Sequence, residues 1–281
     1  MFIRKFTTKL FQLIITILLL IFTQSIQAQD HKEFKWQKGQ ELTYGVDYSF
    51  FHLGKITLSN LGKEEVNGKN ANHIKVVIQS NPLLFWIDHE SVYNTYITDD
   101  FKVARFVSDE KIDGEKYNAI YDFDYDNMKI NVSLVDLEDP KKVQKKTLTL
   151  TPKKIDGISL IYFARINSAI PGKDTVSTFI EDKSGDVVFN FTEERTITEI
   201  DSIPQGLSTL YFNGELFVEG IAGVTGPFEA WFSDDAFRVP ILSYMEVFIG
   251  SVKIELEGWK KWSPYNEVSE KNDSLKSIKQ N

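Results

Sequence analysis

Apolar residues recur at every second position over residues 39–60 of this chain. The alternation runs through Leu42–Phe50 and returns at Ile56 and Leu58. Because successive side chains of a β-strand point to opposite faces, a period of two places one face of each strand on a core. His52–Gly54 stands between the two runs, so the sequence predicts a hairpin that reverses there.

Further alternating runs follow, separated by short polar segments. Asn67-Gly68 suits the two positive φ angles of a tight hairpin turn, and turns are also expected at Asp126-Asn127, Ser184–Asp186 and Asp234-Asp235. The expected strands cover residues 73–79, 89–125 with an interruption at Asp113-Gly114, 128–135, 141–150, 174–181, 187–200, 207–219, 228–241 and 250–257. The predicted fold is therefore mainly β: a curved antiparallel sheet or a partly open β-barrel.

One helix is expected, over residues 156–168. Asp156 or Ser159 can cap its start, and Pro171-Gly172 follows its end. Its predicted buried face consists of residues spaced three and four apart, namely Leu160, Phe163, Ala164 and Asn167. A single helix in a β chain usually covers the sheet, so we expect it to pack on the concave side.

Two features interrupt these regular patterns and leave alternatives open. Arg165 lies among apolar neighbours of the helix, where it can form a structural ion pair or anchor the anionic head group of a ligand. The run from Ser80 to Ile87 contains Pro82 and then bulky apolar residues, Phe85 and Trp86 among them. This run fits a helical plug at the end of a barrel, or a patch that meets a ligand or a membrane.

The N-terminus has the pattern of an export signal. Basic residues precede an apolar run from Leu10 to Phe22, which is too short for a comfortable membrane span. We expect a signal peptide over residues 1–28 with cleavage after Ala28; an uncleaved N-terminal anchor is the alternative. After cleavage no integral membrane segment is expected. The exported protein would be periplasmic or extracellular.

The remaining chain is acidic and undivided. Loss of residues 1–28 removes three positive charges and changes the net charge from −8 to −11. Nucleic-acid partners are therefore not expected, since they need clustered Lys and Arg. No Pro/Gly/Ser-rich linker divides the chain, so residues 29–262 are expected to form a single β-rich domain, beginning with a loose polar arm over residues 29–38. Residues 263–281 are expected to be a disordered polar tail.

Four stretches of the chain carry a family resemblance: Gly39–Tyr44 with Gly54, Ile158–Arg165, Ala230–Asp235 with Arg238–Pro240, and Gly250–Leu256. Together they resemble a family of exported bacterial proteins catalogued as domain of unknown function 3108. The resemblance covers about residues 39–257 and implies a secreted, mostly antiparallel β fold. It implies no activity, so no catalytic residues are carried over. In fold alone, such a sheet is similar to periplasmic carriers of lipoproteins.

Residues that could perform chemistry are sparse in the sequence. Among the histidines, Asp88-His89-Glu90 comes nearest to a metal-ligand cluster, but alternate residues of a strand face opposite sides. The chain has no cysteine. We therefore expect no catalytic residue, metal or cofactor, and a non-enzymatic role is favoured. Glycoside hydrolysis needs two carboxylates in a cleft, for which Glu229, Asp234 and Asp235 beside Trp231 are the candidates.

The expected function is binding. We predict an exported cell-envelope protein that holds an apolar or amphipathic ligand such as a lipid, or an envelope protein partner. The predicted ligand-binding residues are Phe85, Trp86, Tyr162, Arg165 and Trp231. The alternative is a structural or assembly module that acts through its surface. This alternative is favoured over ligand binding if Phe85, Trp86, Tyr162 and Arg165 are sealed in a full core. An envelope carbohydrate hydrolase is the third hypothesis.

Overall fold

The alternating runs form a single 15-stranded sheet in the computed structural model, which describes residues 33–83, 90–112, 115–180, 183–220, 224–247 and 250–265. The predicted signal peptide lies outside these residues, so its processing stays a prediction. The described residues belong to one compact unit. The first eight strands are β1 (Glu41–Tyr48), β2 (Phe51–Val66), β3 (Lys69–Ser80), β4 (Glu90–Thr98), β5 (Val103–Ile112), β6 (Glu115–Asp124), β7 (Lys129–Asp136) and β8 (Val143–Thr149).

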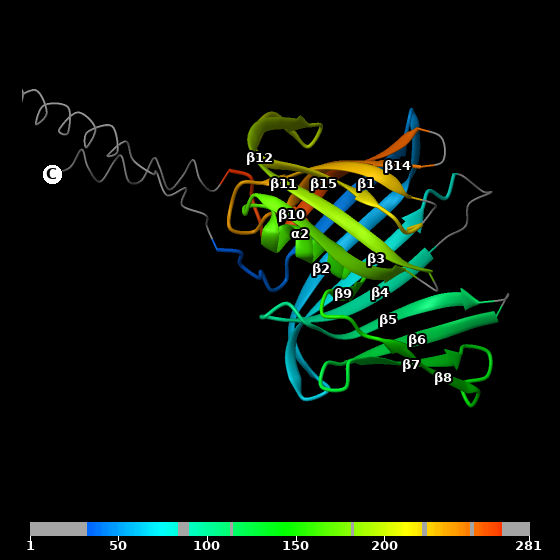
Figure 1. Cartoon of the computed structure of the whole chain (residues 1–281). Helices are drawn as coiled ribbons and strands as arrows, with labels where there is room; N and C mark the ends of the chain where they lie inside the picture. The colour runs from blue at the N-terminus through cyan, green and yellow to red at the C-terminus, as the bar shows by residue number, and fades with distance from the viewer. Residues whose placement is uncertain are drawn as a thin grey trace, which may run out of the picture. The chain divides into compact units, whose positions relative to one another are not determined.

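A helix and seven further strands complete the fold: β9 (Lys154–Asp156), α2 (Ser159–Asn167), β10 (Gly172–Ile180), β11 (Lys183–Ile200), β12 (Ile203–Leu216), β13 (Gly226–Ser233), β14 (Pro240–Glu246) and β15 (Ser251–Lys260). Neighbouring strands pair antiparallel except β9 and β10, which are parallel. Two meanders, β1 to β8 and β9 to β15, meet where β1 pairs with β15. The sheet ends at β8 and β9 without closing, which confirms the predicted fold class (Figure 1).

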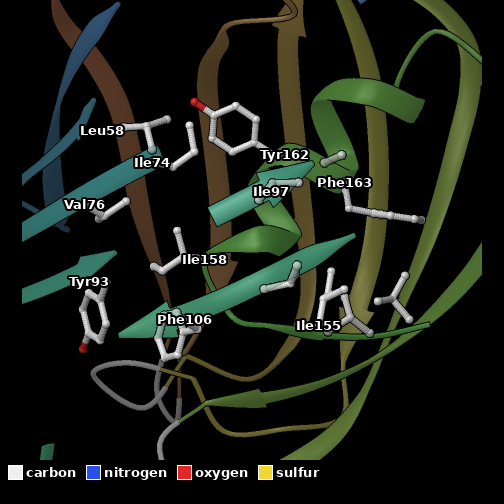
Figure 2. Close-up of a cluster of buried hydrophobic side chains, with 14 of the residues drawn as sticks. Leu58, Ile74, Val76, Tyr93, Ile97, Phe106, Ile155, Ile158, Tyr162 and Phe163 are labelled. Atoms are coloured by element: carbon white, nitrogen blue, oxygen red, sulfur yellow. The ribbon is translucent and has the colours of Figure 1, made fainter. Parts of the chain in front are cut away.

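The core lies between the concave side of the sheet and α2. Side chains from β2, β3, β4 and β5 point toward β9 and α2, as Figure 2 shows for Leu58, Val76 and Phe106. Phe163 of α2 packs on the rings of Phe101 and Phe189. Each fully buried aromatic side chain removes a large apolar area from water, which holds the helix against the sheet.

The helix is shorter than predicted, and its buried face is different. Tyr162, Phe163, Ala164 and Arg165 are buried, whereas the predicted members Leu160 and Asn167 are only half-buried. The spacing rule assumes that one side of a helix faces water. Here the surrounding sheet and the residues before β1 cover two sides of α2, so a polar residue lies in the buried set.

The first hairpin turns earlier than predicted. Ser49, with φ of 55°, and Phe50 form the turn, and His52–Gly54 already belongs to β2. The predicted reversal at His52–Gly54 is therefore wrong. Gly54 serves another purpose: a Cβ at this position would lie 2.2 Å from the carbonyl oxygen of Gln79, so a glycine permits the close approach of β2 and β3.

The other predicted turns give mixed results. Asn67 and Gly68 both have positive φ, and Asp126-Asn127 and Asp234-Asp235 lie in turns, as predicted. Ser184–Asp186 does not turn, because it is part of β11 and pairs with β10. Asp113-Gly114 lies outside the described residues.

Candidate functional site

A buried arginine is the centre of the candidate site. Arg165, in the last turn of α2, has 1% of its surface exposed. Its Nη2 donates hydrogen bonds to Gln40 Oε1 at 2.7 Å and to the carbonyl oxygen of Phe237 at 2.8 Å, and its Nε donates to the same carbonyl at 3.2 Å. The guanidinium also lies over the Tyr162 ring, 4.7 Å from its centroid. The Nε and Nη2 groups of the guanidinium are thus bonded to neutral acceptors only.

These partners come from three distant parts of the chain. Gln40 immediately precedes β1, Phe237 lies in the turn between β13 and β14, and Arg165 comes from α2. Three of the four stretches on which the family resemblance depends, Gly39–Tyr44, Ile158–Arg165 and Ala230–Pro240, contain or enclose them. The fold therefore brings these stretches together around one side chain.

An extended segment covers this cluster, and we call residues 33–38 the N-terminal strap. Trp36 stacks on Tyr162 with a centroid distance of 5.0 Å, and Phe34 lies 5.4 Å from the Arg165 guanidinium. The Lys35 N–H donates to the carbonyl oxygen of Ala236, which fixes the strap against the β13–β14 turn. Phe34 and Trp36 are half-buried. Residues 33–38 of the expected loose arm are therefore packed over the cluster, with Phe34 against Arg165 and Trp36 against Tyr162.

The cluster holds more donors than acceptors. No carboxylate among the described residues pairs with Arg165. Within this cluster, three buried polar atoms have no hydrogen-bond partner: Arg165 Nη1, Gln40 Nε2 and the Tyr44 hydroxyl. Burial raises the pKa of Tyr44 far above its usual range, although nearby Arg165 opposes this shift. The hydroxyl therefore stays protonated and able to donate. Each of the three atoms can donate a hydrogen bond.

The comparison with known proteins identifies the family. The sequence model of a family described as "Protein of unknown function (DUF3108)" matches residues 43–257. The chain belongs to the DUF3108 family. This DUF3108 protein is similar in structure to a β-barrel-like protein of domain of unknown function DUF1849 from Brucella abortus, with a TM-score of 0.50, 10% identity, and coverage of 80% of this chain and 98% of that chain. That likeness concerns the fold alone.

A second solved structure, a Bacteroides fragilis protein with a YmcC-like fold, matches with a TM-score of 0.35 and 8% identity, covering 82% of this chain and 99% of that chain. No curated protein matches the DUF3108 protein. Within the part of the chain that the structure describes, no helix is both long and apolar enough to cross a membrane.

Only part of the predicted ligand-binding set of the DUF3108 protein comes together. Tyr162 and Arg165 are neighbours, each with 1% of its surface exposed. Trp231 lies apart from them on β13, half-buried between Tyr211 and Tyr244 of the adjacent strands. Phe85 and Trp86 lie outside the described residues. Binding by these residues stays a prediction.

Sequence reasoning missed four members of the site: Phe34, Trp36, Gln40 and Tyr44. Tyr44 was assigned to a core strand, which is correct, but its unpartnered hydroxyl has no signature in the pattern. Gln40 is 2% exposed although it lies next to a turn, where a polar residue is expected to face water. Two aromatic residues in an otherwise polar arm were the available signal for the strap.

The acidic residues considered for hydrolysis are engaged elsewhere in the DUF3108 fold. Asp234 pairs with Arg195 at 2.9 Å, and Glu229 accepts a hydrogen bond from the Tyr211 hydroxyl. Asp235 accepts from the backbone N–H groups of Phe237 and Arg238, from Ser233 Oγ, and from Trp262 Nε1. These contacts hold the β13–β14 turn in the shape that presents the Phe237 carbonyl to Arg165.

The predicted absence of a metal site stays a prediction. Asp88 and His89 lie outside the described residues. Among the residues that are described, no group of three or more His, Asp or Glu side chains has the arrangement needed to hold a metal ion.

Replacing Tyr44 with phenylalanine is expected to stabilise the ligand-free DUF3108 protein by about 1 kcal/mol. A buried hydroxyl without a partner carries a desolvation cost of about 1–3 kcal/mol, which phenylalanine removes. Urea unfolding at pH 7 measures the change. Tyr125→Phe is the matched control, because the Tyr125 hydroxyl accepts a hydrogen bond from the Val103 N–H and its loss is destabilising. A Tyr44→Phe protein that loses as much stability as the control contradicts the assignment.

Proposed function

We propose that this DUF3108 protein is a non-enzymatic, exported protein of the cell envelope that binds an amphipathic molecule through an anionic head group. The observation that carries the proposal is the buried Arg165 guanidinium with an unpartnered Nη1 and no described carboxylate beside it. The N-terminal sequence supports export, to the periplasm or outside the cell.

The energetic basis is the cost of burying a charge. A cation without a counter-charge in a protein interior costs several kcal/mol. The hydrogen bonds to Gln40 and Phe237 and the contact with the Tyr162 ring offset part of that cost. A carboxylate or phosphate would supply the missing charge and accept from Arg165 Nη1, Gln40 Nε2 and the Tyr44 hydroxyl.

The N-terminal strap offers a route to this site. It holds Phe34 and Trp36 over the cluster and joins the β13–β14 turn through the bond from Lys35 to Ala236. Moving the strap aside would expose Arg165 and Tyr162 and leave the space of two aromatic side chains. An apolar chain could then occupy that space, with its head group on Arg165.

Native mass spectrometry of the protein purified gently from its own envelope tests the proposal. We expect a stoichiometric anionic amphiphile, identified after denaturing extraction. Arg165→Met is expected to reduce its occupancy at least about tenfold, the loss expected for a charge-assisted bidentate contact. Arg105→Met is the matched control, because Arg105 pairs with Asp122 at the surface, and it should retain the ligand.

Circular dichroism establishes that both variants are folded before occupancies are compared. Arg165→Lys adds a second comparison, since it keeps the charge but loses the planar fork, and intermediate occupancy is expected. A bare mass for the wild-type protein, or equal occupancy in the Arg165→Met and Arg105→Met variants, would refute the proposal.

One observation favours the second candidate function, a structural or assembly module. Tyr162 and Arg165 are sealed from solvent, and the aromatic core fills the space beneath α2. A protein that acts only through its surface needs no opening of the strap. Crosslinking in the native envelope, combined with a bare protein mass, would support this function over ligand binding.

A further inference from the structure

The two ends of the sheet differ in chemistry. Four exposed apolar side chains lie in or beside turns at one end: Phe50 is 83% exposed, Leu83 84%, Phe217 59% and Phe51 48%. We call these four residues the apolar rim. We propose that the apolar rim docks the protein on the surface of a lipid bilayer. This inference goes beyond the ligand site at Arg165 and does not depend on it.

Strand register places the rim residues at the same end. Tyr48, the last residue of β1, pairs with Phe51 of β2 and with Val252 of β15. Ser80, the last residue of β3, pairs with Gly54, so Leu83 follows at that end too. The pairing continues along the other half of the sheet (Figure 1). The start of β15 pairs with the end of β14, and the end of β14 pairs with the start of β13. The start of β13 pairs in turn with the end of β12, and Phe217 directly follows β12.

Local contacts hold part of the rim together. The rings of Phe50 and Phe51 lie 4.2 Å apart. Asn81 joins the two neighbouring loops, because its backbone N–H donates to the Leu53 carbonyl at 2.7 Å and its Nδ2 donates to the His52 carbonyl at 2.9 Å. Phe50, Phe51 and Leu83 therefore project from one connected structure.

The segments that carry Phe50, Phe51 and Leu83, residues 48–54 and 80–83, contain no Asp, Glu, Lys or Arg. Among the described residues that flank these segments in the chain, Asp47 pairs with His52, and near Phe217 the side chain of Glu219 pairs with Lys183. The turns at the other end of the sheet are acidic and include Asp99, Asp100, Asp124, Asp126, Asp201 and Asp234. The segments that carry Phe50, Phe51 and Leu83 can enter a bilayer interface without desolvating a charge of their own. The charged β7–β8 turn at the same end of the strands lies at the edge of the sheet, away from β1, β2 and β3.

The dimensions favour a bilayer over a protein partner. A stable protein interface buries about 800 Å² on each partner in a closely packed patch. Four side chains distributed over separate turns do not form such a patch, whereas protruding Phe and Leu side chains suffice for insertion at the boundary between head groups and acyl chains. Because the rim lacks basic residues, the surface it fits is a zwitterionic lipid, which needs no attraction between opposite charges.

Flotation of the full exported protein with phosphatidylcholine vesicles tests the proposal. The double variant Phe50→Ser/Leu83→Ser is expected to bind at least about tenfold more weakly, since each buried apolar side chain contributes strongly to transfer from water. Ile170→Ser/Ile197→Ser is the matched control, because these residues are 59% and 68% exposed and lie toward the other end of the sheet. The control should bind like the wild type. All four sites are exposed, so both proteins should fold.

A second measurement locates the contact. The chain has no cysteine, so Leu83→Cys and Ile197→Cys each accept one environment-sensitive fluorophore. With vesicles, only the label at position 83 should shift to shorter wavelength. Equal binding of the two double variants, or equal shifts at the two positions, would overturn the proposal. It would also fail if sedimentation without vesicles showed a wild-type dimer and a monomeric Phe50→Ser/Leu83→Ser variant, because the rim would then bind a second copy.

Discussion

Replacing Asp156 with alanine is expected to lower the free energy of unfolding by about 3–5 kcal/mol, because four buried donors would lose the acceptor that they share. Asp156 is fully buried between β9 and α2. Its Oδ1 accepts from the N–H groups of Ile158 and Ser159 at 2.9 Å, and its Oδ2 accepts from the hydroxyls of Ser159 and Thr95. The carboxyl thus starts the helix and joins it to β4. Urea unfolding at pH 7 measures the loss.

Asp156→Asn is the matched control and also reveals a pH dependence. Burial raises the pKa of the Asp156 carboxyl above its ordinary value, and the hydrogen bonds from Ser159, Thr95 and Ile158 oppose this only in part. The stability that this shift contributes is fully present below the pKa of the unfolded state and is lost as pH rises through the folded-state pKa. Asparagine does not titrate, so the free energy of unfolding of the Asp156→Asn variant should rise relative to that of the wild type as pH increases from 4 to 7.

The two variants are expected to differ in stability at pH 7. The alanine variant should be the least stable, and the asparagine variant should lie close to the wild type because its amide can donate to hydroxyls that rotate. An alanine variant within about 1 kcal/mol of the wild type would show that the four hydrogen bonds add nothing net to stability.

Replacing Phe179 with alanine is expected to cost about 3–5 kcal/mol, the range for removing a buried aromatic side chain. Phe179 of β10 is 2% exposed, and its ring lies 4.8 Å from that of Tyr121, 5.9 Å from that of Phe106 and 6.1 Å from that of Phe123. The last three residues belong to β5 and β6, in the other half of the sheet. The substitution therefore leaves a cavity where side chains of β10 pack on those of β5 and β6.

Guanidinium unfolding of Phe179→Ala and Phe179→Leu measures this effect. Leucine fills part of the space and should cost less than alanine. Ile197→Ala is the surface control and should change stability by no more than about 0.5 kcal/mol. A Phe179→Ala protein as stable as the Ile197→Ala control would mean that the two halves do not pack through this cluster.

Periodicity predicts the strands well because it reports directly on burial. The polar and apolar residues of β7 alternate from Lys129 to Leu134, and the burial of these residues alternates in the same way. The first turn was misplaced because Gly54 and His52 look like turn residues locally. Their actual conformation depends on β3, whose backbone closely approaches Gly54. The sequence of residues 49–54 alone does not predict this contact.

The candidate site was only half predictable for the same reason. An arginine among apolar helix residues is visible in the sequence and marks Arg165 as a candidate, but its burial and its neutral partners are not predicted. Its acceptor Gln40 lies 125 residues away and its acceptor Phe237 lies 72 residues away. Both acceptors are neutral, one of them a backbone carbonyl that any residue could supply. No pattern of residue types specifies such contacts; they follow from the tertiary fold.

The pairing of β1 with β15 has a kinetic consequence. Glu41 lies opposite Lys260, so the centre of the sheet is formed by the first and last strands of the domain. Local hairpins from β1 to β8 can form as soon as they are synthesised, but contacts between residues so far apart in sequence are slow to form. Until β15 arrives, the second edge of β1 stays unpaired and able to add a strand from another chain. Protection of this edge against aggregation therefore depends on the pairing of β1 with β15.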